Sequence, residues 1–209
     1  MSERAVAVLI LLSLLGCGRS DALADKPAEA AAAPAAVTPP EFQLPSAAND
    51  TVIRIAWRSP LLRRSPTTVY TLFGDGRLER QSLPASAPPP ATPSAVPAPT
   101  GIVTLDAQEM HELAALAASP DLIEGDAGVL AKELYSAGVG IMDGAMFTVD
   151  VRLTSYARGT VSFGPVERRY ALVEPATAAE ANPQKKGVQA LARLVRAVVE
   201  THKAKEAKQ

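Results

Sequence analysis

Cysteine, histidine and aromatic residues are scarce in this chain of 209 residues. It contains one cysteine and two histidines, and aromatic residues make up 4% of it. A single cysteine excludes a disulfide framework and a cysteine-ligated metal site, so a folded domain must be held together by its apolar core. We expect His111 beside the apolar stripe of a helix and His202 in a basic tail, and neither has a second histidine at ligand spacing. The sequence therefore predicts no metal and no other cofactor.

The chain also has almost no net charge and contains no common catalytic motif. The formal net charge is −1, which gives no reason to expect nucleic acid or an anionic membrane surface as a partner. No serine lies in a G-x-S-x-G motif, the turn that carries a hydrolase nucleophile. Residues 138–144 have the spacing G-x-G-x-x-x-G and precede a predicted strand. They indicate a connector with a turn at Asp143-Gly144 rather than a phosphate loop, and we assign no catalytic or cofactor-binding residue.

The N-terminal apolar segment is too short to span a bilayer. Residues 5–15 are uncharged, but a transmembrane helix needs about 20 apolar residues, so the segment is typical of a signal peptide. It closes with Leu14-Leu15-Gly16-Cys17, which resembles the lipobox of bacterial lipoproteins with a type II signal peptide. The resemblance implies that Cys17 becomes the acylated N-terminus and anchors the chain to a membrane, and that Gly18 in the next position favours the outer membrane. The alternative is an ordinary signal peptide followed by an unpaired thiol.

Segments rich in proline and alanine separate the predicted parts of the chain. We expect a signal peptide over residues 1–16, followed over 17–48 by the lipid-attachment cysteine and a disordered Ala/Pro-rich stalk. A single globular domain is predicted over 49–203, with a disordered Pro-rich loop at 83–100, and a charged tail over 204–209. Such a loop is tolerated because the entropy of loop closure grows only slowly with length.

The alternation of apolar and polar residues predicts five to six strands. The clearest alternation places Phe147, Val149, Val151 and Leu153 on one face. The expected strands cover residues 52–58, 67–73, 77–82, 147–153, 160–163 and 168–173. The second and third are joined by Gly74-Asp75-Gly76, which is a strong hairpin signal.

Two helices are predicted with defined ends. The first begins after Asp106, which forms a capping box with Glu109, and ends before Pro120. The second is expected to begin with Asn182 as N-cap and Pro183 in the first position, and its apolar stripe is predicted at Val188, Leu191, Val195 and Val198. Only a short helical turn is expected over 129–134. The order of elements predicts an α+β fold, an antiparallel sheet of about five to six strands with two helices packed on one face. The alternative is a curled, sandwich-like sheet.

The arrangement loosely resembles small uncharacterised domains of bacterial lipoproteins. The likeness rests on the glycine hairpin, the capped helix and the strands that follow Phe147, and it implies no activity. Arginine is dense at positions 54, 58, 63, 64, 77 and 80, which we expect to line one face of the first strands. That face would suit an anionic glycan, whereas ordinary solvated arginines are the alternative.

The lack of a reactive constellation favours a non-catalytic function. Our first hypothesis is a lipid-anchored extracytoplasmic domain that binds an envelope protein or an anionic glycan. The alternative is an envelope hydrolase that uses Asp143 or Asp150 together with an arginine. That alternative requires a pocket in which the carboxylate and the arginine converge.

Overall fold

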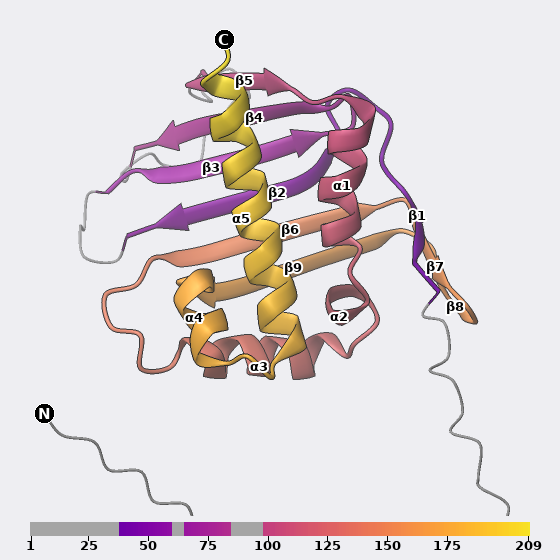
Figure 1. Ribbon diagram of the computed structural model, residues 1–209, viewed down its shortest axis with the longest axis vertical. Coiled ribbons are helices and arrows are strands. Elements are labelled where there is room, and N and C mark those ends of the chain that lie inside the picture. The colour runs from indigo at the N-terminus through magenta and orange to yellow at the C-terminus, as the bar shows by residue number, and fades with distance from the viewer. Residues whose placement is uncertain (1–37, 60–64, 85–97) are drawn as a thin grey trace, which may run out of the picture. The chain divides into compact units, whose positions relative to one another are not determined.

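The main sheet of the protein is antiparallel (Figure 1). The computed structural model describes residues 38–59, 65–84 and 98–209, which belong to a compact unit beginning at Val37. Six strands of these residues form the sheet: β2 (Thr51–Arg58), β3 (Thr67–Phe73), β4 (Arg77–Leu83), β5 (Gly101–Thr104), β6 (Met146–Leu153) and β9 (Val166–Val173). Their spatial order is β5-β4-β3-β2-β6-β9, so β5 and β9 are the edge strands.

The strand predicted over residues 52–58 is confirmed as β2, and its alternation explains why one face of the sheet is buried. Ile53 and Ile55 are fully buried, whereas Arg54 between them is partly exposed. Ile53 pairs with the buried Val151 of β6. Since a slip of one residue would turn the arginine into the core, the burial of this face fixes the register of the sheet.

The predicted hairpin is confirmed as β3 and β4, joined by Gly74-Asp75-Gly76. Gly76 has a φ of +85°, a conformation that favours glycine. Gly74 is required for a different reason, which is its close approach to the chain that enters β2. Its amide donates a hydrogen bond to the Asp50 carbonyl at 2.9 Å. A Cβ atom on Gly74 would lie 2.8 Å from the Ala47 carbonyl oxygen, so the turn packs directly against the chain that enters β2.

The described residues contain five helices, and the predicted α+β class is confirmed. The helices are α1 (Ala107–Ala117), α2 (Pro120–Ile123), α3 (Ala127–Gly138), α4 (Pro175–Ala181) and α5 (Lys186–Glu206). Figure 1 shows α5 crossing one face of the sheet with α1, α2 and α4 beside it, and α3 along the β9 edge. The prediction of two helices was therefore too low. The long helix α5 contacts each of the other four.

The capping box predicted for α1 is confirmed. The Asp106 carboxylate accepts a hydrogen bond from the Glu109 amide, and the Glu109 carboxylate accepts one from the Asp106 amide, both at 2.9 Å. The helix ends at Ala117, before Pro120 as expected. Leu113 and Ala117 are buried, and α1 packs beside α5. The sequence therefore correctly predicted both ends of this helix.

The start predicted for the last helix is wrong. Asn182 is the C-cap of α4, and α5 begins at Lys186. The side-chain amide of Asn182 donates a hydrogen bond to the Ala178 carbonyl at 2.9 Å, so this residue ends one helix instead of opening the next. The predicted apolar stripe of α5 is nevertheless confirmed, because Val188, Leu191, Val195 and Val198 are all buried.

A second sheet of three strands pairs the N-terminal part of the described chain with the segment that follows β6. It consists of β1 (Glu41–Gln43), β7 (Ser155–Arg158) and β8 (Val161–Phe163), in the order β1-β7-β8. Residues 41–43 were expected in the stalk, but they pair with β7, and Phe42 lies opposite the buried Tyr156. Cys17, the N-terminal part of the predicted stalk and residues 85–97 of the predicted loop lie outside the described residues.

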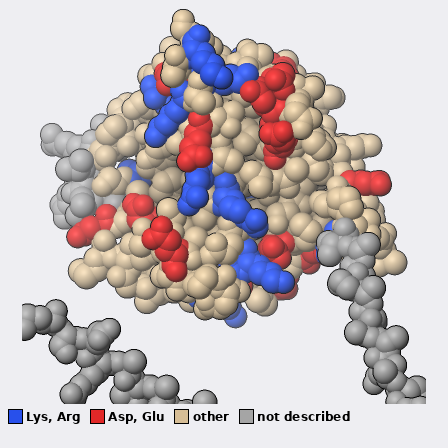
Figure 2. Space-filling view, in the orientation of Figure 1, with Lys and Arg blue, Asp and Glu red and all other residues tan. Residues whose placement is uncertain are grey.

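Charged side chains of both signs are scattered over the face that the helices cover (Figure 2). Basic side chains follow α5, which carries the exposed Arg193, Arg196 and Lys203. Within the described residues, no helix combines the length and the apolar character needed to cross a membrane.

Candidate functional site

A large, mostly apolar depression lies between α3 and β9. Its volume is about 740 Å³, within the range of roughly 300–1,000 Å³ that is typical of small-molecule sites. Apolar side chains form most of its wall, among them Leu134, Tyr135, Val139, Met146, Leu172 and Val173. We call this depression the α3–β9 groove.

Small residues on α3 explain why the groove exists. Asp126 caps this helix by accepting a hydrogen bond from the Val129 amide at 2.8 Å. Leu130 and Leu134 bury one side of α3, whereas Ala127 and Ala131 remain exposed on the side that lines the groove. Because alanine fills little volume, open space remains between the helix and β9.

The walls of the groove are held at both ends. At the C-terminal end of α3, a Cβ atom on Gly138 would lie 3.2 Å from the Val173 Cβ atom, so helix and strand pack closely there. Nearer the other end, the Tyr170 hydroxyl donates a hydrogen bond to the Leu122 carbonyl at 2.8 Å. Burial raises the pKa of Tyr170, so this phenol stays neutral and its hydrogen bond is retained at physiological pH.

Exposed apolar side chains surround the mouth of the groove. The exposed fraction is 78% for Tyr135, 68% for Val139, 86% for Met142 and 48% for Met146. Three of them line the groove, and Met142 lies in the connector that joins α3 to β6. Exposed large apolar side chains that gather at a depression are typical of interaction sites in soluble proteins.

One end of the groove carries charge. Glu167, Arg168 and Arg169 are consecutive residues of β9 that line it. Arg169 Nε lies 2.5 Å from Asp150, and Glu167 lies 3.5 Å from Arg152 Nε. Arg168 differs, because it forms no ion pair within the part of the chain that the structure describes.

The guanidinium of Arg168 is also incompletely hydrogen-bonded. Its Nη2 donates to the Ile123 carbonyl at 3.4 Å, and its buried Nε has no hydrogen-bond partner among the described residues. Buried polar groups are normally paired, so an unsatisfied donor is a feature that needs an explanation. The groove therefore combines an apolar wall with one cation that has spare donors.

Asp150, one of the two carboxylates proposed for a hydrolase, lies on the open face of the sheet. It sits between Arg54 at 3.8 Å and Arg169 at 2.5 Å, and together they line a shallow polar depression of about 490 Å³. The Asp150 carboxylate raises the pKa of Arg169 by accepting its hydrogen bond. Asp143, the other candidate, lies in the connector with a φ of +64° and lines neither depression. The convergence of a carboxylate with an arginine that the hydrolase alternative requires is therefore found at Asp150 and not at Asp143.

The expected arginine face is divided between the two sides of the sheet. Arg80 pairs across the strands with the buried Tyr70 on the helix-covered side and forms an ion pair with Glu206 at 3.5 Å. Arg54 and Arg77 lie on the open side, Arg58 is exposed, and residues 63 and 64 lie outside the described residues.

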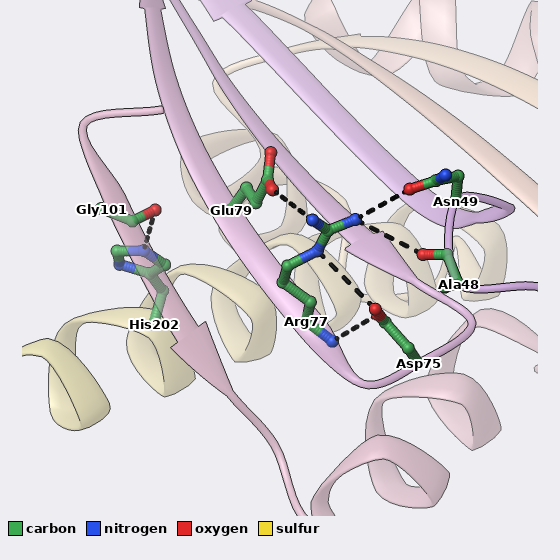
Figure 3. Close-up of polar contacts among 7 residues, drawn as sticks. All are labelled: Ala48, Asn49, Asp75, Arg77, Glu79, Gly101 and His202. Carbon is green, nitrogen blue, oxygen red and sulfur yellow. Dashed lines mark hydrogen bonds and ion pairs between the residues drawn. The ribbon is translucent and has the colours of Figure 1, made fainter. Parts of the chain in front are cut away.

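Arg77 contacts several neighbouring groups (Figure 3), although its buried Nε lies 3.8 Å from Asp75 and has no hydrogen-bond partner among the described residues. Its guanidinium lies 3.3 Å from Glu79 and donates hydrogen bonds to the Asn49 side chain at 3.2 Å and the Ala48 carbonyl at 3.4 Å. It also stacks over the Phe73 ring, 4.5 Å from the ring centre. These contacts fasten the chain entering β2 to the hairpin, and they leave Arg77 a structural residue.

The two histidines are far from forming a metal site. His111 is exposed and stacks on Phe42, with 5.2 Å between the ring centres. The expectation for His202 is wrong, because α5 continues through it and its side chain is fully buried, edge-on to Tyr70. Its Nε2 lies 3.4 Å from the Gly101 carbonyl (Figure 3). Within the described part of the chain, no group of three His, Cys, Asp or Glu residues is placed to hold a metal ion.

The groove was not predicted from the sequence. Residues 129–134 were expected to form a short turn, whereas α3 spans twelve residues. The available signals were Asp126, which is a good N-cap, and the apolar residues Tyr135, Met142 and Met146 in a segment otherwise interpreted as a connector. A comparison of the chain with protein-family models, curated proteins and solved structures finds no match.

Proposed function

We propose that this protein is a lipid-anchored extracytoplasmic lipoprotein whose domain binds an apolar ligand of the cell envelope in the α3–β9 groove. The observation that carries the proposal is the groove itself, an apolar cavity of about 740 Å³ whose mouth is lined by exposed apolar side chains. Exposing such groups to water is unfavourable, so a ligand that covers them gains binding free energy.

The anchor part of the proposal rests on the lipobox-like sequence that ends at Cys17. Several acyl chains on this cysteine hold a protein stably on a membrane, because each buried methylene contributes roughly 0.8 kcal/mol. The proline-rich segment that follows would hold the domain away from the lipid surface. The residue after the cysteine is Gly18, and this favours the outer membrane.

The anchor is tested by intact-mass analysis of the natively expressed chain and of Cys17→Ser. We expect a lipid-sized mass increase and detergent-phase partitioning that are both lost in the variant. An unmodified, water-soluble native protein would contradict the anchor and leave Cys17 a free thiol.

The binding part is tested with Nile red, a neutral dye whose fluorescence rises in apolar surroundings. We expect saturable binding to the full chain carrying Cys17→Ser, and at least about a tenfold loss of affinity when Ala131→Trp fills the groove. Ala176→Trp, the same change at an exposed alanine of α4, is the matched control. Equal dye binding by the two tryptophan variants would overturn the assignment of the groove.

A further inference from the structure

We propose that the ligand of the α3–β9 groove is a single long-chain fatty acid, with its carboxylate at Arg168 and its chain along α3 toward Met146. This inference rests on the proposed function and adds the chemical class of the ligand. It joins two features of the groove that a purely apolar ligand leaves unexplained, the unpaired cation at one end and the exposed apolar mouth at the other.

The length of the groove suits one acyl chain. The groove is lined from Ala127 to Gly138 of α3, and twelve helical residues extend over about 17 Å. A lipid chain spans half of the hydrocarbon core of a bilayer, roughly 15 Å. The cavity of about 740 Å³ also falls in the size range of small-molecule sites.

The charge at the Arg168 end of the groove suits one carboxylate. Glu167 and Arg169 are each paired with a partner on the open face, at 3.5 Å and 2.5 Å, so they largely cancel. Arg168 is left with a buried Nε that lacks a partner in the described residues. A guanidinium binds a carboxylate through two parallel hydrogen bonds, and one unpaired cation matches a single negative charge better than the higher charge of a phosphate group.

The apolar end suits a flexible chain. Met146, which lines this end, is long, unbranched and polarisable, and methionine adapts to ligands of varying shape. A peptide that adds as a strand to β9 is disfavoured as the ligand of the groove, because α3 packs against that edge of the sheet. A second copy of this chain remains a testable occupant of the exposed mouth.

The experiment measures displacement of Nile red from the full chain carrying Cys17→Ser, in detergent-free buffer, by hexadecanoate and by hexadecanol below their aggregation concentrations. We expect hexadecanoate to bind at least about tenfold more tightly, because hydrogen bonds to a charged group are worth more than those to a hydroxyl. Arg168→Met should bring hexadecanoate down to the affinity of hexadecanol and leave hexadecanol unchanged. Arg196→Met, at an exposed arginine of α5, should alter neither.

Other outcomes separate the two proposals. Equal affinities for the acid and the alcohol, or a preference that survives Arg168→Met, would overturn the fatty acid while leaving an apolar binding groove. Should Arg168→Met fail to fold, Arg168→Lys is the second variant, because it keeps the positive charge without the planar guanidinium. It is expected to lower the affinity for hexadecanoate and to leave that for hexadecanol unchanged. Sedimentation of a dimer that hexadecanoate does not dissociate would assign the groove to a second copy of the chain. Absence of dye binding overturns the proposed function itself.

Discussion

Glu124 shows how a single residue joins the helix layer of this protein to its three-stranded sheet. Its carboxylate accepts hydrogen bonds from Arg158 Nε and Nη2, both at 2.6 Å, and from the Tyr156 hydroxyl at 2.5 Å. Tyr156 is fully buried. The fork of Arg158 lowers the pKa of Glu124, and burial raises the pKa of Tyr156. A glutamate that follows α2 thus fastens the helix layer to the three-stranded sheet.

This cluster makes stability depend on pH in the acid range. The pKa of Glu124 is lower in the folded state than its ordinary value near 4.3. The stabilisation is therefore complete above that value and is lost as the pH falls through the lower folded value. We expect the free energy of unfolding in urea to fall more steeply below about pH 4.5 for the wild type than for Glu124→Gln. At pH 7 the variant is expected to be less stable than the wild type. Glu180→Gln, at an exposed carboxylate of α4, is the control, and parallel pH profiles would contradict the role of Glu124.

Gly74 allows the hairpin to approach the chain entering β2. In Gly74→Ala the new Cβ atom would press on the carbonyl oxygens of Pro45 and Ala47, which are backbone atoms that cannot rotate away. We expect a loss of about 1–3 kcal/mol in the free energy of unfolding. Gly164→Ala is a suitable control, because its Cβ atom meets nothing within 4 Å. Equal unfolding midpoints for the two variants would show that the turn can shift at little cost.

At the scale of elements, local sequence signals were sufficient to predict a helix or strand where its capping residues or its alternation are clear. The capping box of α1 and the alternation of β6 were predicted correctly from the sequence. The start of α5 was not, because Asn182 hydrogen-bonds backward to α4, and a single sequence does not show which helix an asparagine caps. β1 was missed because its three residues follow a proline-rich stretch and pair only with the distant β7.

The capping box offers a prediction at this scale. Asp106→Ala removes the acceptor for the Glu109 amide, and loss of an N-cap typically costs about 1 kcal/mol. We expect thermal unfolding at a temperature a few degrees lower. Gln108→Ala, in the first turn of the same helix and exposed, should change stability by less than about 0.5 kcal/mol. A larger effect of the glutamine variant would mean that α1 is held by its surface side chains instead.

For the whole molecule, the sequence predicted the fold class better than the candidate site. Periodicity identifies which residues are buried, and this is enough for an α+β sheet covered by helices. The groove depends on where α3 lies relative to β9. It also depends on the separate partners of Glu167 and Arg169, Arg152 and Asp150, which leave Arg168 without an ion pair among the described residues. Such relations follow only from tertiary structure, so Arg168 had no signal in the sequence that distinguished it from its neighbours.

The N-terminal boundary of the domain gives the last prediction. A chain that starts at residue 49, the boundary expected from the sequence, lacks β1 together with the partly buried Phe42 and Leu44, which pack against the core. It also lacks the Ala48 carbonyl that Arg77 contacts. Because burial of a large apolar side chain contributes about 1.5–3 kcal/mol when complete, we expect this chain to be less stable than one starting at residue 38 by about 2–4 kcal/mol. Equal urea midpoints for the two would mean that β1 is an attachment to the domain and not part of its cooperative unit.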